Sequence, residues 1–226
     1  MHRPTFLAFG RLRPRRARRG VAPAVLSLAL LIVPAPAAAQ WTFEGFVGGA
    51  FSVPTPLTIS QAGYPDVRFT AHYETKPLAS RLYYAWRLAR WTTDHGWLLE
   101  HVHHKIYLKT PTSVVQDFEV SHGYNLVTIN RGWKRGHNVL VVGGGLVITF
   151  PHSDVRGKIY PHKETYKLSG ATIQGGVARQ LDLSKHVFVT GEGKFSASWA
   201  RVPIVDGHAK VPNVAFHFLA GGGWQF

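Results

Sequence analysis

The residues of this chain best suited to chemistry are polar side chains at the ends of three apolar segments. They are His103 and Lys105, then His122 and Asn125, then His152. Imidazoles act as acids and bases when carboxylates lie near them, and they also bind divalent metals. These five residues form a candidate catalytic group, in which His103, His122 and His152 are candidate metal ligands. A divalent metal is the one cofactor that such a group suggests.

Two further charged residues, Glu192 and Lys194, are expected beneath this group. They belong to a larger set of charges that alternation turns toward one face of their strands. An unpaired buried charge is strongly destabilising, so inward charges in a narrow barrel are expected to pair with one another. The members of this expected network are Glu44, Arg81, Arg87, Glu100, Glu192 and Lys194.

Other readings of the histidine-rich segments are weaker. If Glu100 faces inward, alternation turns His101 and His103 outward, unless a bulge resets the register near His103. Those histidines would then lie at the level of lipid headgroups. Serine acyl transfer requires a serine, a histidine and an acid held together. Alternation separates Ser121 from His122, so the set of these two residues with Glu119 is disfavoured.

The elements that must position these residues are predicted to be β-strands. Short segments of alternating polarity recur between breaks that contain Gly, Pro and Asp, and no segment has the period of a helix. An all-β fold with eight antiparallel strands follows. The predicted strands are Trp41–Val53, Arg81–Trp91, Trp97–Leu108, His122–Trp133, Asn138–Phe150, Lys167–Leu181, His186–Arg201 and Val211–Phe226.

The last strand indicates which side of the sheet is apolar. Val214, Phe216, Phe218 and Trp224 share one face, whereas the other face is small or polar. This pattern is typical of a strand with lipid on one side and a polar lumen on the other. The alternative is a soluble β-sandwich or lipocalin-type barrel with its apolar face inside. The signal-like N-terminus and the terminal Phe226 favour the membrane barrel.

The connections between the predicted strands alternate in length. Short connections at Thr92–Gly96, Gly132–His137 and Asp182–Lys185 fit periplasmic turns, and longer ones fit extracellular loops. The longer connections are Pro54–Ser80, Lys109–Ser121, Pro151–Tyr166 and Val202–Lys210. Aromatic residues gather near the short turns, as in an interfacial girdle, namely Trp41, Trp91, Trp97, Trp133, Trp224 and Phe226.

The N-terminal segment is predicted to be a cleaved signal peptide of residues 1–39. An arginine-rich stretch precedes the apolar run Val21–Val33, and Ala37–Ala39 supplies small residues before Gln40. The run is too short to span about 30 Å of hydrocarbon. The remaining residues 40–226 carry 19 Lys and Arg against 12 acids, a net charge of +7. This moderate charge does not favour nucleic acid as a partner, and the absence of cysteine excludes disulfides and thiol chemistry.

The order of several short motifs resembles a family of small outer-membrane barrels that includes lipid A oxidases. The terminal Phe226 is similar to the assembly signal of such barrels, which implies the barrel-assembly machinery as a partner. The chain departs from the family in its additional histidines at 101–104, and it lacks a lipid A deacylase pattern. The matching pieces are Leu99-Glu100, His103-x-Lys105-x-Tyr107, Asn125-x-x-Thr128-x-Asn130, Gly143–Gly145 leading to Pro151-His152, Tyr166-x-Leu168-x-Gly170-x-x-x-Gln174 and Glu192-x-Lys194.

Three functions follow from these observations. The leading hypothesis is a monomeric integral barrel of the bacterial outer membrane, with a lumen filled by side chains and a structural or surface-interaction role among lipids and lipopolysaccharide. The alternative is an oxidase-like enzyme that modifies lipid A, with its site near the outer-leaflet ends of the third to fifth strands. A passive pore is disfavoured, because eight strands enclose barely enough space for their own side chains.

Overall fold

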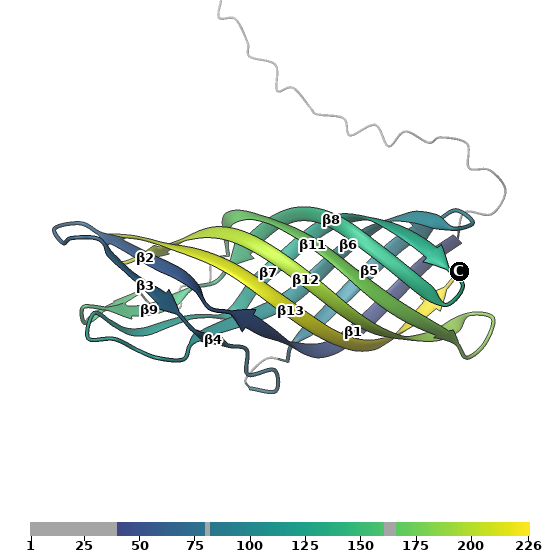
Figure 1. The fold of residues 1–226 in the computed structure, drawn as a ribbon, viewed down its shortest axis with the longest axis horizontal. Coiled ribbons are helices and arrows are strands. Elements are labelled where there is room, and N and C mark those ends of the chain that lie inside the picture. Colours follow the sequence, from purple (N-terminus) through teal and green to yellow (C-terminus); the bar gives the residue numbers. More distant parts are fainter. Residues whose placement is uncertain (1–39, 80–81, 161–165) are drawn as a thin grey trace, which may run out of the picture. The chain divides into compact units, whose positions relative to one another are not determined.

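Alternating polarity along the chain produces one antiparallel sheet that closes on itself. The computed structural model describes residues 40–79, 82–160 and 166–226, so the predicted signal peptide and Arg81 lie outside the described residues. Eight strands form the ring, in which β13 pairs with β1 and thereby closes the barrel (Figure 1). The ring strands are β1 (Gln40–Val53), β5 (Tyr84–Trp91), β6 (His95–Leu108), β7 (Val115–Arg135), β8 (Asn138–Thr149), β11 (Lys167–Asp182), β12 (Val187–Ile204) and β13 (Gly207–Gln225).

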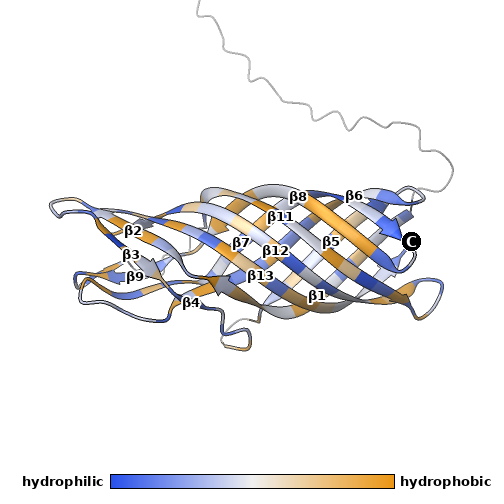
Figure 2. Cartoon of the chain, in the orientation of Figure 1, coloured by the Kyte–Doolittle hydropathy of each residue, from blue (hydrophilic) through white to orange (hydrophobic). Residues whose placement is uncertain are grey.

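The predicted all-β fold and its eight antiparallel strands are confirmed. Within residues 40–79, 82–160 and 166–226, no helix is long and apolar enough to cross a membrane. Alternation is clear in β12, where Glu192, Lys194 and Ser196 are buried while Phe195 and Trp199 are exposed. Figure 2 shows the same alternation of hydrophilic and hydrophobic positions along the ring strands. The barrel is therefore polar inside and apolar outside, the reverse of a soluble β-protein.

The ring strands continue past the expected ends to form an extension opposite the C-terminus (Figure 1). The predicted loop Val202–Lys210 is wrong, because β12 and β13 continue to a tight hairpin whose turn is Val205–Asp206. Asp206 has φ of 56°, a conformation that Asp tolerates in turns. Five short strands complete the extension: β2 (Thr55–Gln61), β3 (Val67–Ala71), β4 (Tyr73–Glu74), β9 (His152–Val155) and β10 (Lys158–Tyr160).

The extension has an apolar interior. The predicted loop Lys109–Ser121 is wrong in its second part, because β7 begins at Val115 and includes Glu119 and Ser121. Those residues occupy the outer face, whereas Phe118 and Val120 point inward and pack with Leu57 of β2. Burial of these side chains stabilises the longer strand by roughly 1.5–3 kcal/mol each. Residues that looked like loop therefore build a second, conventional hydrophobic core above the membrane-spanning ring.

One aromatic residue predicted for the girdle lies elsewhere. Trp91 is 1% exposed and points into the lumen, where its Nε1–H donates to Thr42 Oγ1 at 3.1 Å. It packs with Leu98 and Val141 in an apolar layer at the short-turn end. The other predicted members are exposed, as an interfacial girdle requires. They are Trp41, Trp97, Trp133, Trp224 and Phe226.

Glycines in the ring make room for inward side chains. A Cβ at Gly143 would lie 2.3 Å from Asn130 Oδ1, and a Cβ at Gly223 would lie 2.2 Å from the ring of Phe188. Contacts this short do not occur between real atoms, so a side chain at either position would displace its neighbour. Gly143 of β8 and Gly223 of β13 are thus required by the packing of a narrow lumen.

Candidate functional site

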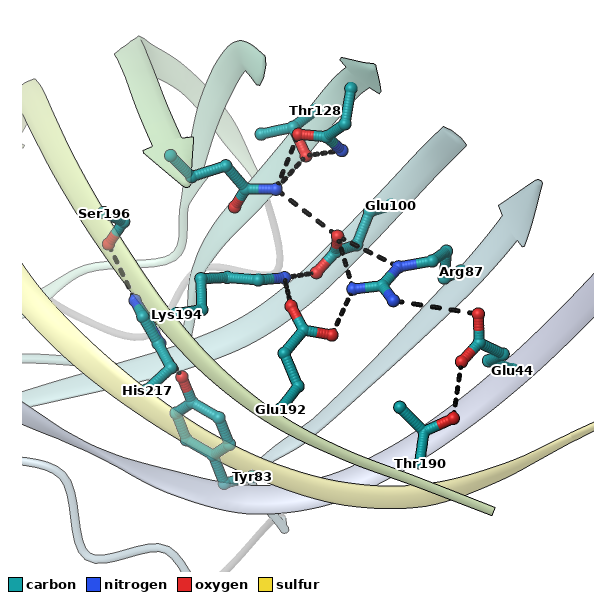
Figure 3. Close-up of polar contacts among 12 residues, drawn as sticks. Glu44, Tyr83, Arg87, Glu100, Thr128, Thr190, Glu192, Lys194, Ser196 and His217 are labelled. Atoms are coloured by element: carbon teal, nitrogen blue, oxygen red, sulfur yellow. Dashed lines mark hydrogen bonds and ion pairs between the residues drawn. The ribbon is translucent and has the colours of Figure 1, made fainter. Parts of the chain in front are cut away.

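The middle of the lumen holds a network of five buried charges (Figure 3). Arg87 of β5 contacts three carboxylates: Glu192 at 2.5 Å, Glu100 at 3.2 Å and Glu44 at 3.7 Å. Lys194 pairs with Glu100 and, at 3.0 Å, with Glu192. Each of these side chains is at most 1% exposed. The predicted lumen network is therefore formed by all of its members that the structure describes.

Neutral polar groups hold the carboxylates of this network in place. Gln174 donates from Nε2 to Glu100 Oε2 at 3.3 Å, and Thr190 donates to Glu44 Oε2 at 3.0 Å. Buried charges are stable only when pairs and hydrogen bonds compensate for lost hydration. The two cations offset most of the charge of the three carboxylates.

A second polar layer lies beside the charges and contains two histidines. Both ring nitrogens of His217 form hydrogen bonds: Nδ1 with the Tyr83 hydroxyl, and Nε2 with Ser196 Oγ at 2.7 Å. His104 Nε2 lies 3.0 Å from Asn213 Oδ1, and the two imidazole rings meet edge to face at 5.2 Å. All these side chains are buried.

Apolar layers seal the polar lumen at both ends. The layer around Trp91 lies at the short-turn end. At the other end, Val102, Ile106 and Tyr124 join the core of the extension. An ion would have to displace both layers and break the charge network to cross the barrel.

The outer face of β6 carries a different polar group. His101 Nε2 and His103 Nδ1 lie 3.1 and 2.9 Å from Asn125 Oδ1 of β7. An amide oxygen only accepts, so both nitrogens carry hydrogens. His103 also stacks on Tyr84, with ring centroids 4.9 Å apart, and His101 stacks on Trp86 at 5.8 Å.

These histidines face outward because β6 keeps its alternation throughout. Glu100, Val102 and His104 point inward, and no bulge resets the strand at His103. The irregularity lies on the partner strand, where residues 121–123 of β7 oppose Lys105 alone. Gly123, with φ of 128°, makes this bulge possible.

Lys105 contacts the loop that connects β4 and β5. Strands β4 and β5 both pair with β6, and the described residues between them, 75–79 and 82–83, lie outside the sheet. The Lys105 ammonium donates to the carbonyl oxygens of Lys76 at 2.9 Å and of Ala79 at 2.6 Å. Lys105 therefore anchors the loop that follows β4 to β6.

Ser121, His122 and Glu119, which strand alternation was expected to separate, come together at the bulge of β7. Ser121 Oγ lies 3.0 Å from Glu119 Oε1 and 3.0 Å from His122 Nδ1. In a catalytic triad the acid orients the histidine, which in turn accepts the serine proton. Here Glu119 and His122 both contact the same oxygen of Ser121, whereas a triad places the histidine between the acid and the serine.

The barrel wall divides the candidate catalytic residues into two sets. Glu192 and Lys194 are in the lumen, whereas His103, Lys105 and Asn125 belong to the outer face of β6 and β7. His122 stacks on Phe150, and His152 lies 3.6 Å from Asp117 in the extension. Across the described ranges, His103, His122 and His152 do not gather with other His, Asp or Glu into a group of three that could hold a metal.

Tyr84 and Trp86 belong to the outer polar group but are absent from the sequence-based candidates. Alternation along the predicted strand Arg81–Trp91 places both on its lipid-facing side, which does not distinguish them from other apolar residues. The spacing of His101 and His103 on one face was the available signal, since their cross-strand partners in β5 are Trp86 and Tyr84.

Replacing Asn125 by leucine tests how strongly this outer group is held. We expect the free energy of unfolding to fall by about 1–3 kcal/mol, because the change leaves two imidazole N–H groups without their acceptor. Urea unfolding in detergent micelles, followed by tryptophan fluorescence, measures the change. Asn138→Leu, at an exposed position of β8, is the matched control and should change stability by less than about 0.5 kcal/mol. Equal effects of the two substitutions would contradict the hydrogen bonds of Asn125 with His101 and His103.

Comparison with known proteins finds structural likeness without detectable relatedness in sequence. No protein-family model matches the chain, and no curated protein is detectably related to it in sequence. Similar solved structures include the outer membrane protein OprG from Pseudomonas aeruginosa (10% identity, 84% of this chain and 96% of that chain, TM-score 0.47) and Ail, the attachment invasion locus protein of Yersinia pestis (11%, 83% and 99%, 0.42). Neisserial surface protein A is also similar (11%, 84% and 99%, 0.41). At these identities the likeness concerns strand arrangement and says nothing of activity.

Proposed function

We propose that this protein is an integral barrel of the bacterial outer membrane that conducts no solute and acts as a structural or surface-interaction protein. One observation supports this above all others: the ring is apolar outside, while its lumen is closed by paired charges between two apolar layers. Every backbone polar group of a closed ring is satisfied within the sheet, as a bilayer demands. The extension then projects from the cell surface and is available to partners.

Two associations belong to the same proposal. Phe226 forms reciprocal backbone hydrogen bonds with Trp41, at 3.0 and 3.1 Å, where the last strand meets the first. A terminal aromatic at the closing seam is suited to recognition by the barrel-assembly machinery. Outer-membrane lipids and lipopolysaccharide contact the apolar belt, and a single chain completes the ring without a second copy.

Conductance in a planar lipid bilayer tests the closed lumen. We expect the inserted full-length protein to show no stepwise current, because an ion would have to cross both apolar layers. Insertion is verified in parallel by protease protection in liposomes made from the same lipids. Stable channel openings from inserted protein would overturn the proposal.

A lipid A-modifying enzyme remains a second candidate because of the outer polar group. Polar residues on the lipid-facing side of a barrel are destabilising and are retained when they have a function. His101, His103 and Asn125 occupy such a position on β6 and β7. Mass spectrometry of lipid A from cells with the wild-type protein, with Asn125→Leu and without the gene distinguishes the two candidates. An unchanged lipid A profile across the three strains would exclude the enzyme.

A further inference from the structure

The outer face of the extension carries a row of basic residues across four paired strands. Arg201 of β12 pairs with Lys210 of β13, Lys210 pairs with Thr58 of β2, and Thr58 pairs with Arg68 of β3. The three cations are exposed. Directly paired residues have Cβ atoms only about 5 Å apart, so the like charges of Arg201 and Lys210 destabilise the hairpin unless an anion lies between them.

An apolar border lies beside this row, on the side of the membrane-spanning ring. Trp199 pairs with Pro212 across β12 and β13, and Trp199 is 59% exposed. With Pro56 they form one wall of a groove of about 700 Å³, and Arg68, Arg201 and Lys210 line the same groove. A tryptophan at this position is typical of the membrane interface. The groove therefore presents an apolar edge toward the bilayer and cations away from it.

The cations that line the groove outnumber its acidic residues. Asp66 is the acidic residue that lines it, and no ion pair within the described residues involves Arg68, Arg201 or Lys210. Arg201 instead donates from Nη2 to His208 Nδ1 at 3.0 Å. With Asp66 against three cations, the row keeps a net positive charge.

We propose that this groove binds the phosphate-bearing headgroup of an anionic lipid of the outer leaflet. The inference rests on the proposed membrane insertion, with the short turns periplasmic and the extension outside. Guanidinium groups donate paired hydrogen bonds to phosphate oxygens, and Lys210 adds a mobile ammonium. Trp199, Pro212 and Pro56 contact the sugar or glycerol part, beneath which acyl chains enter the bilayer. An amphipathic ligand fits this arrangement better than a free anion does.

Binding of phosphorylated lipid A to the full-length protein in phosphatidylcholine nanodiscs tests the proposal. We expect Arg201→Gln/Lys210→Gln to weaken binding about tenfold or more, since hydrogen bonds to charged groups are strong. Arg179→Gln/Lys185→Gln removes two exposed cations at the opposite end of the barrel and should leave binding unchanged. Equal weakening by both variants, or by neither, would overturn the site.

Two comparison ligands identify the source of the phosphate. Dephosphorylated lipid A should bind at least about tenfold more weakly than the phosphorylated form. Inorganic phosphate should compete poorly, because it makes no contact with the apolar edge. Unchanged binding of dephosphorylated lipid, or full competition by inorganic phosphate, would refute a lipid headgroup site. Failure of the protein to enter nanodiscs would instead refute the proposed membrane insertion.

Two physical readouts follow the bound anion directly. In nanodiscs without lipid A, Lys210→Gln should raise the unfolding midpoint, because it relieves repulsion from Arg201; with phosphorylated lipid A it should lower the midpoint. Burial and the charges of Arg201 and Lys210 lower the pKa of His208, which Asp66 partly opposes. NMR titration should therefore show this pKa rising when the lipid phosphate binds. A midpoint that moves in the same direction with and without lipid A would contradict the proposal.

Discussion

Arg87→Met should lower the free energy of unfolding by about 3–5 kcal/mol, since it leaves buried carboxylates without their shared counter-charge. Glu44, Glu100 and Glu192 all contact this one guanidinium in the lumen. Lys194 compensates for two of them, but among the described residues Glu44 forms its ion pair with Arg87. Equilibrium urea unfolding in lipid vesicles, followed by tryptophan fluorescence, measures the loss.

Two further variants separate the charge network from general damage to β5. Arg90 lies on the exposed face of the same strand. Arg90→Met should therefore change the free energy of unfolding by less than about 0.5 kcal/mol. Adding Glu192→Gln to Arg87→Met should restore part of the lost stability, because it removes one uncompensated charge. A loss below about 1 kcal/mol for Arg87→Met would show that the network does not stabilise the barrel.

Ile173→Arg should destabilise the membrane-inserted protein by about 2–4 kcal/mol, the penalty for a cation on the lipid face of a barrel. Ile173 lies on β11 and is 55% exposed, and Ile159 on β10 of the extension is 59% exposed. In water the two positions would be equivalent surface sites. Ile159→Arg is therefore the matched control, and it should be neutral within about 0.5 kcal/mol.

Contact with lipid is the expected cause of the difference between Ile173→Arg and Ile159→Arg. Unfolding in vesicles should separate the two isoleucine substitutions, because only Ile173 then contacts acyl chains. Equal and small effects in vesicles would show that the ring does not lie in the bilayer. Equal and large effects would show that the extension is also embedded.

Much of the ring could be predicted because period-two alternation is a local property. Each ring strand has one lipid-facing and one lumen-facing set, so the inward direction of Glu100, Glu192 and Lys194 follows from neighbouring residues alone. The expectation that these charges pair follows from the high free energy of an isolated buried charge. The extension was harder to predict, because its outer polar residues on β7 look like a loop until the inward partners Phe118 and Val120 are known to have a core.

The sequence by itself determined an antiparallel barrel with an apolar exterior and a lumen of opposed charges, because strand alternation and charge burial need no long-range information. Only the tertiary structure decided which partners meet, because ring register joins residues as distant as Arg87 and Glu192, 105 positions apart. It also placed His103 and Asn125 outside the wall and Glu192 and Lys194 inside it. The tight turn at Val205–Asp206 likewise brought Arg201 opposite Lys210, a pairing that depends on hairpin register rather than on residue type.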